Sequence, residues 1–130
     1  MAAYTTTVTS AWLNWVSGNT TPSAAATRYI TTFNGDPQSG GSENIATITG
    51  SANRINMTTA VPTTATATVS SNADIVFTTS ASAGATVNYI AIYTAITGGT
   101  LLASASVTSR TLVTGDGLKI PSGSLTLSIS

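Results

Sequence analysis

Residues suited to catalysis or metal binding are scarce in this sequence. The chain contains no His and no Cys, which are among the commonest general bases and metal ligands in proteins. Ser and Thr are abundant, but a hydroxyl group is a weak nucleophile unless a base lies beside it. The four acidic residues are dispersed along the chain, at Asp36, Glu43, Asp74 and Asp116. The sequence therefore predicts no enzymatic activity, no catalytic residue and no cofactor.

One pair of carboxylates has a spacing that deserves a test as a metal site. Asp36 and Glu43 flank the Gly-containing segment 38–42, so together with backbone carbonyls they could hold a Ca²⁺ ion. Against this, Asp36 stands in a Gly-containing turn, where an Asp side chain is expected to hydrogen bond to its own backbone. We expect no metal site. The Gly98-Gly99 pair is interpreted as a turn, because no helix or Lys follows to complete a phosphate-binding loop.

The composition of the chain argues against nucleic-acid and membrane partners and favours other proteins as partners. Charged residues make up 6% of the chain and the net charge is zero, whereas ordinary soluble domains carry about 25% charged residues. The positive residues are dispersed, and nucleic-acid binding needs clustered cations, so no nucleic-acid partner is expected. No apolar run approaches the roughly 20 residues of a membrane span, so no membrane partner is expected. A hydroxyl-rich surface with few charges to desolvate suits burial against other protein surfaces.

The N-terminal segment is the best helix candidate. Apolar residues recur at spacings of three and four from Val8 onward, which predicts a helix over residues 8–18. A helix this short must dock to be stable, and Trp12 and Trp15 provide a large apolar anchor. Two interpretations remain open, namely that the Trp residues cover an open end of their own domain or that they face a neighbouring subunit. The candidate interface residues are Trp12, Trp15 and Val16.

The rest of the chain has the pattern of short strands separated by turns rich in Gly and Ser. Strands are expected at residues 28–33, 45–48, 54–58, 66–69, 75–77, 87–94, 101–107 and 125–130. Residues 87–94 carry apolar side chains on both faces, so this strand should lie centrally. Regularly spaced short strands predict an all-β fold, an antiparallel β-sandwich of the Ig-like or jelly-roll-like kind. A length of 130 residues suits a single domain, with the sandwich over residues 28–130.

The predicted core follows from the apolar positions of these strands. Its expected members are Ile75, Phe77, Ile90, Ile92, Leu101, Leu125 and Leu127.

The segment YIAIYTAITGGTLL at residues 89–102 resembles a known family. The family comprises small β-sandwich virion proteins of tailed bacteriophages, labelled tail-fibre-like or decoration proteins. Further elements occur in the family's order: the N-terminal helix, FNGDPQSGGSE at 33–43, Arg54 shortly after a Gly, and a Gly-Asp-Gly turn before a terminal LTLSIS. The resemblance covers roughly residues 28–130. The chain departs from the pattern in a longer Thr/Ala stretch at 59–71.

The resemblance implies a non-enzymatic structural protein of a tailed-phage virion. We expect synthesis in the host cytoplasm, because the N-terminus lacks the basic start and apolar core of a signal peptide. The first hypothesis is a capsid decoration or cement protein that stabilises the head, where symmetry multiplies weak contacts. The alternative is a small tail-fibre or tail-associated protein for host adhesion, which the family label favours. A secreted bacterial β-sandwich module is a third hypothesis, disfavoured by the missing signal.

The expected partners follow from the same hypotheses. They are copies of the chain itself, as a homo-oligomer for which a trimer is the first expectation, and other virion proteins such as the major capsid protein. A monomer that becomes ordered on a capsid lattice is the alternative to a preformed oligomer.

Overall fold

The computed structural model describes residues 3–20, 27–57, 68–71, 73–78 and 85–128. The helices are α1 (Thr6–Val16), α2 (Ile45–Thr49) and the short 3-10 helix η1 (Pro37–Ser39). The strands are β1 (Ala3–Tyr4), β2 (Arg28–Asn34), β3 (Ser42–Glu43), β4 (Ile55–Met57), β5 (Thr68–Ser70), β6 (Ile75–Thr78), β7 (Ala85–Tyr93), β8 (Leu101–Leu112), β9 (Gly117–Ile120) and β10 (Thr126–Ser128). Within these ranges no helix is both long and apolar enough to cross a membrane.

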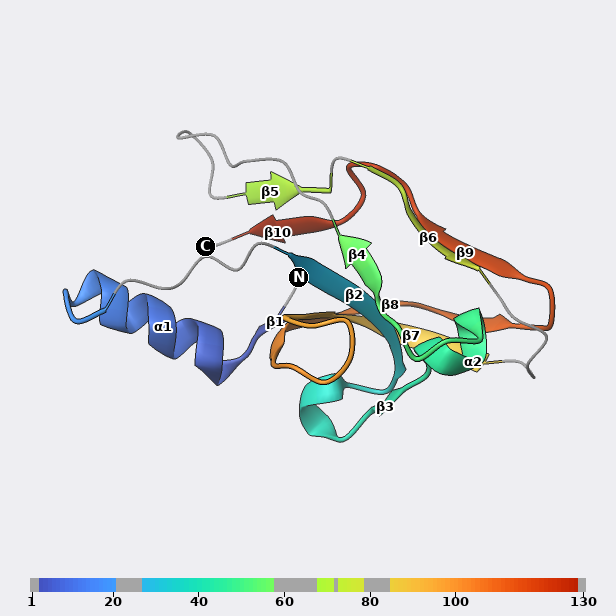
Figure 1. Ribbon diagram of the computed structural model, residues 1–130, viewed down its shortest axis with the longest axis horizontal. Helices are drawn as coiled ribbons and strands as arrows, with labels where there is room; N and C mark the ends of the chain where they lie inside the picture. Colours follow the sequence, from blue (N-terminus) through green and yellow to red (C-terminus); the bar gives the residue numbers. More distant parts are fainter. Residues whose placement is uncertain (1–2, 21–26, 58–67, 72, 79–84, 129–130) are drawn as a thin grey trace.

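The strands form an antiparallel sandwich. The larger layer is a six-stranded sheet in the order β1-β8-β7-β2-β3, with β4 also paired to β2. Two antiparallel ribbons, β6 with β9 and β5 with β10, form the second layer (Figure 1). The layers are joined by apolar packing, because Phe77 of β6 shares one buried cluster with Ile90 and Ile92 of β7. The predicted all-β sandwich with a short N-terminal helix is confirmed.

The core lies between the central strands and the β6–β9 ribbon. Phe77 and Ile30 are fully buried at its centre. Of the predicted core residues, Ile75, Phe77, Ile90, Ile92 and Leu125 are buried. Leu101 is half-buried, and the side chain of Leu127 lies outside the part that the structure describes.

Strand β7 is central, as predicted, but its two faces do not alternate strictly. Val87 pairs with Arg110 and Tyr89 pairs with Ser106, so Asn88 alone lies opposite a three-residue stretch of β8. This bulge changes the direction in which side chains point. Val87 consequently joins the buried cluster that contains Ile90, whereas strict alternation would place it on the face of Tyr89.

One predicted strand is wrong. Residues 45–48 form the helix α2, in which Ile45 and Ile48 are both buried. A spacing of three places two side chains on one face of a helix but on opposite faces of a strand. Gly50 ends the helix with φ of 73°, a left-handed conformation that glycine adopts without steric cost.

Candidate interaction site

The helix α1 is tethered to the sheet edge immediately before its first turn. Strand β1 pairs with Ala103 and Ser104 of β8. The backbone N–H of Thr5 then donates to the carbonyl of Leu102 (2.9 Å), and its hydroxyl donates to the carbonyl of Leu101 (3.0 Å). From this anchor the helix extends away from the strands, so that its far end stands clear of the β-sandwich (Figure 1).

The apolar stripe of α1 extends further along the helix than the strands that it packs against. The stripe consists of Val8, Ala11, Trp12, Trp15 and Val16. The helix spans Thr6–Val16, beginning and ending two residues earlier than the predicted 8–18. Near its start, Val8 and Ala11 face the molecule's own strands. Near its end, Trp15 and Val16 are 58% and 77% exposed. The helix therefore overhangs the domain, and the second half of the stripe has no covering surface in the described part of the chain.

The three predicted interface residues consequently have different environments. Trp12 is half-buried against its own domain, with its ring centroid 5.1 Å from that of Tyr4. Trp15 and Val16 are exposed, together with Leu13, which is 69% exposed. The sequence reasoning did not select Leu13, because it lies beside the stripe rather than on it. We refer to Leu13, Trp15 and Val16 as the exposed apolar end of α1.

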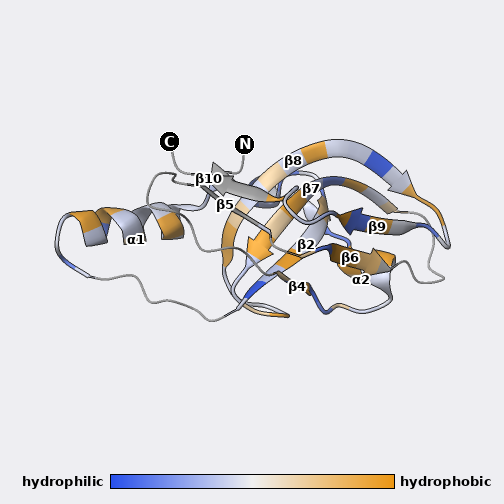
Figure 2. Ribbon diagram, turned by 90° about the horizontal axis from the view of Figure 1, so that it is seen from above, coloured by the Kyte–Doolittle hydropathy of each residue, from blue (hydrophilic) through white to orange (hydrophobic). Residues whose placement is uncertain are grey.

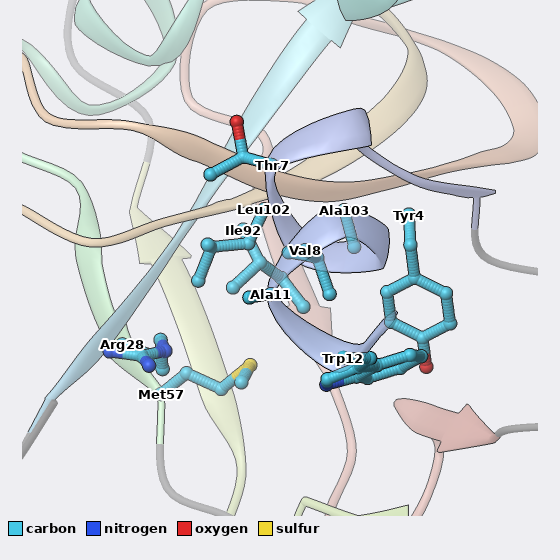
Figure 3. Close-up of a pocket in the computed structure, with 10 residues that line it drawn as sticks. All are labelled: Tyr4, Thr7, Val8, Ala11, Trp12, Arg28, Met57, Ile92, Leu102 and Ala103. Carbon is cyan, nitrogen blue, oxygen red and sulfur yellow. The ribbon is translucent and has the colours of Figure 1, made fainter. Parts of the chain in front are cut away.

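Between the first half of the helix and the sheet lies an open cavity of about 290 Å³, here called the α1 pocket (Figure 3). Its lining residues are Tyr4, Thr7, Val8, Ala11, Trp12, Arg28, Met57, Ile92, Leu102 and Ala103. Most of these are apolar, and Arg28 is the one charged residue among them. The Nη1 atom of Arg28 donates to the carbonyl of Thr27 at 3.1 Å. No carboxylate within the described ranges forms an ion pair with Arg28.

A second cluster of polar contacts surrounds Arg54, which is 7% exposed. Its Nε and Nη2 atoms donate to the two carboxylate oxygens of Glu43 at 2.8 and 3.0 Å. Its Nη1 atom donates to the carbonyls of Ala95, at 3.0 Å, and of Gly98. The guanidinium carbon lies 3.7 Å from the ring centroid of Tyr93. Every nitrogen of the buried cation thus has an acceptor, which is the condition for burying a charge at tolerable cost.

The Arg54 cluster fixes the loop that joins β7 to β8. Two carbonyls of that loop accept from the guanidinium, and the backbone N–H of Arg54 donates to the carbonyl of Ile96 at 3.1 Å. The predicted Thr-Gly-Gly turn lies here. Gly99 has φ of 71°, and a Cβ atom added to it would lie 2.8 Å from Cβ of Ala95. Only glycine fits this position, so the turn is held both by backbone geometry and by Arg54.

The Glu43 carboxyl responds to this environment. Burial alone would raise its pKa, but hydrogen bonds from Arg54 and Thr31 and the charge of Arg54 outweigh burial and hold the pKa below its ordinary value of 4.5. A lowered pKa in the folded state stabilises the fold above the ordinary value, and this stabilisation is lost as the pH falls below it.

The melting temperature should therefore drop as the pH is lowered from 6 through about 4.5 and below, as the carboxylate of Glu43 takes up a proton. Glu43→Gln should have a lower melting temperature at pH 6 and a flatter acid profile. Asp116→Asn is the control, because Asp116 stands in a turn and accepts one hydrogen bond from the backbone of Val113. Identical acid profiles for wild type and Glu43→Gln would contradict the assignment; thermal scans followed by circular dichroism supply the measurement.

The other carboxylates are also engaged locally. Asp36 accepts from the backbone N–H of Gln38 at 2.9 Å, as expected for an Asp in a turn, while Glu43 is bound to Arg54 and Thr31. Asp74 lies 3.8 Å from Lys119 across the β6–β9 ribbon. In the described ranges no three acidic residues approach closely enough to hold a metal ion.

Comparison with known protein families gives a match over most of the chain. The family model described as "Podophage GP4 fiber I protein gp80" matches residues 3–128 of this chain. The match includes β1, α1, the Arg54 cluster and the strands of both layers. No curated protein matches the chain significantly.

Proposed function

Because this chain belongs to the family of the podophage GP4 fiber I protein gp80 and is therefore a tailed-phage virion protein, we propose that it is a structural subunit of the tail fibre. It acts by packing against other subunits and not by catalysis. The observation that carries the packing part of this proposal is the exposed apolar end of α1, which no strand in the described part of the chain covers. Large apolar side chains that are exposed together at the end of one helix are typical of interaction sites on folded proteins.

The composition supports assembly through the same surface. No residue of Thr6–Val16 is charged, and the whole chain has a net charge of zero. Copies of such a protein do not repel one another, and a neutral surface has few groups whose desolvation costs free energy. Copies of the chain and neighbouring virion proteins are thus the partners that we propose.

A non-catalytic role is supported by what the side chains do. The chain lacks His and Cys, and the carboxylates of Asp36, Glu43 and Asp116 hydrogen bond within their own turns or to Arg54. A general base must face a pocket in which a substrate can bind, and its acceptor atom must be free to take the substrate's proton. The α1 pocket contains Arg28 but no carboxylate.

Capsid decoration is the second candidate. A compact sandwich with a nearly uncharged surface suits a protein that sits between capsomers and contributes many small contacts. The description of the matched family favours the fibre, so we place decoration second.

A phage from which this gene is deleted separates the two candidates. For a fibre subunit, the mutant particles should lack fibres in electron micrographs and adsorb poorly to the host, while their DNA-filled heads keep the heat resistance of wild type. Particles with intact fibres and heads that lose DNA at a lower temperature would exclude the fibre and support decoration.

The low charge leads to a separate prediction for the purified protein. Salt screens interactions between exposed charges, and the exposed apolar end of α1 has none. The self-association constant should change by less than about threefold between about 50 mM and about 500 mM NaCl, as measured by sedimentation equilibrium. A tenfold weakening over that range would show that ion pairs hold the subunits together.

A further inference from the structure

The exposed apolar end of α1 and the α1 pocket form a complementary pair on one chain. From this pair we infer that Trp15 of one copy inserts into the α1 pocket of a second copy, and that the second copy returns the same contact. The inference rests on the proposed self-association and names the surface through which it occurs. Trp15, which is 58% exposed, is the side chain that inserts. The largely apolar pocket beside Val8 and Ala11 is the site that receives it.

The size of the pocket suits an aromatic ring. Its volume is about 290 Å³, whereas an engineered cavity of about 150 Å³ with aliphatic walls binds benzene. The pocket is open to the surface, with α1 on one side and the sheet residues Ile92, Leu102 and Ala103 on the other (Figure 3). An indole ring entering from outside would bury its apolar area against both walls.

Arg28 makes an aromatic side chain a better occupant than an aliphatic one. Its guanidinium lies at the side of the pocket near Met57 (Figure 3) and has no ion-pair partner in the described part of the chain. A cation beside the face of a Trp ring is attracted by the ring's negative face, an interaction that a Leu or Val side chain does not supply. The charge of Arg28 thus complements the Trp residue that the chain itself exposes.

The spacing along α1 allows the exchange to be reciprocal. Helical residues rise about 1.5 Å each, so Trp15 lies about 6 Å further along the axis than Ala11. When two α1 helices run antiparallel with a two-fold axis beside Trp12 and Leu13, Trp15 of one copy lies opposite Ser10 of the other, next to Ala11. This arrangement places both Trp15 rings at the two pockets, and it also brings the exposed Leu13 side chains together. Such a contact is isologous and closes on itself.

The test uses one variant that removes the ring and another that fills the pocket. Trp15→Ala leaves the pocket open but takes away its occupant, while Ala11→Leu keeps Trp15 but occupies the pocket from the helix side. Each should weaken dimerisation by about tenfold or more, as truncation of a buried interface aromatic does. Asn14→Ala, an exposed change on the same helix, should leave dimerisation unchanged. Thr7→Leu, at the exposed rim of the pocket, replaces Ala11→Leu should the latter lower the melting temperature.

Mixing the two variants gives the decisive measurement. A Trp15→Ala chain offers an empty pocket and an Ala11→Leu chain offers a Trp15, so the mixture regains one of the two contacts. Sedimentation velocity should then show dimers in the mixture at concentrations where neither variant dimerises alone. Wild-type dimers that survive Trp15→Ala unchanged would overturn the insertion and leave the proposed self-association intact. A wild type that stays monomeric at high micromolar concentration would overturn both.

Discussion

Replacing Arg54 by Met should lower the free energy of unfolding by about 2–4 kcal/mol, because the buried guanidinium donates hydrogen bonds to the partly exposed Glu43 carboxylate and to two backbone carbonyls. The substitution keeps an unbranched apolar stem but removes the guanidinium. The Glu43 carboxylate then keeps the hydrogen bond from Thr31 but loses both donors from Arg54, and the carbonyls of Ala95 and Gly98 lose the guanidinium donor. Urea denaturation followed by circular dichroism measures the change.

The matched control is Arg110→Met, because Arg110 lies exposed on β8 and its loss should cost less than about 0.5 kcal/mol. A combined Arg54→Met and Glu43→Leu variant should be more stable than Arg54→Met alone, because no unpaired carboxylate then remains. A loss below about 1 kcal/mol for Arg54→Met would show that the loop between β7 and β8 does not depend on this cluster.

Phe77→Ala should be of similar severity, with a loss of about 3–5 kcal/mol. Phe77 is 0% exposed and belongs to the cluster that joins β6 to the six-stranded sheet, so its removal leaves a cavity between the two layers. Val76→Ala is the control on the same strand, since Val76 is 49% exposed and should cost less than about 1 kcal/mol. Equal losses for the two variants would mean that β6 does not present Phe77 to the core.

Much of the β structure could be predicted because its residues follow simple periods. Residues 28–33 and 75–77 lie within β2 and β6, and the turn after residue 94 separates β7 from β8. The misses have local causes. Ile45 and Ile48 are three residues apart and fit a helix. Strand β8 continues past the predicted end at 107 to Leu112, because its last residues pair with the start of β7 beyond the bulge opposite Asn88. A run of exposed Ser and Thr carries no period that a sequence reader can detect.

The candidate site was predictable in part. The spacing of Trp12, Trp15 and Val16 indicated an apolar stripe, but the sequence cannot show where the underlying sheet ends. That boundary determines that Trp12 is covered while Trp15 is exposed. The Arg54–Glu43 pair was missed as well, since a separation of eleven residues carries no periodic signal. The residues beside Arg54 are Asn53 and Ile55, and they give no sign of a buried ion pair.

The helix α1 extends away from the strands of the sandwich (Figure 1). In Figure 2 the helix projects from the sandwich with apolar residues at both of its ends. A protein that acts as a monomer usually exposes few large apolar side chains close together. The overhang is the observation on which our proposal of a neighbouring subunit rests.

The most direct test of the fibre assignment is the position of this chain in the particle. An epitope tag at an exposed position such as Ser122, in the turn between β9 and β10, detected with gold-labelled antibody on purified virions, locates each copy relative to head and tail. We expect the gold to lie on the tail fibres, with none on the capsid shell. Gold distributed over the head, or particles that bind no gold although the tagged protein is expressed, would contradict the assignment of this chain to the fibre.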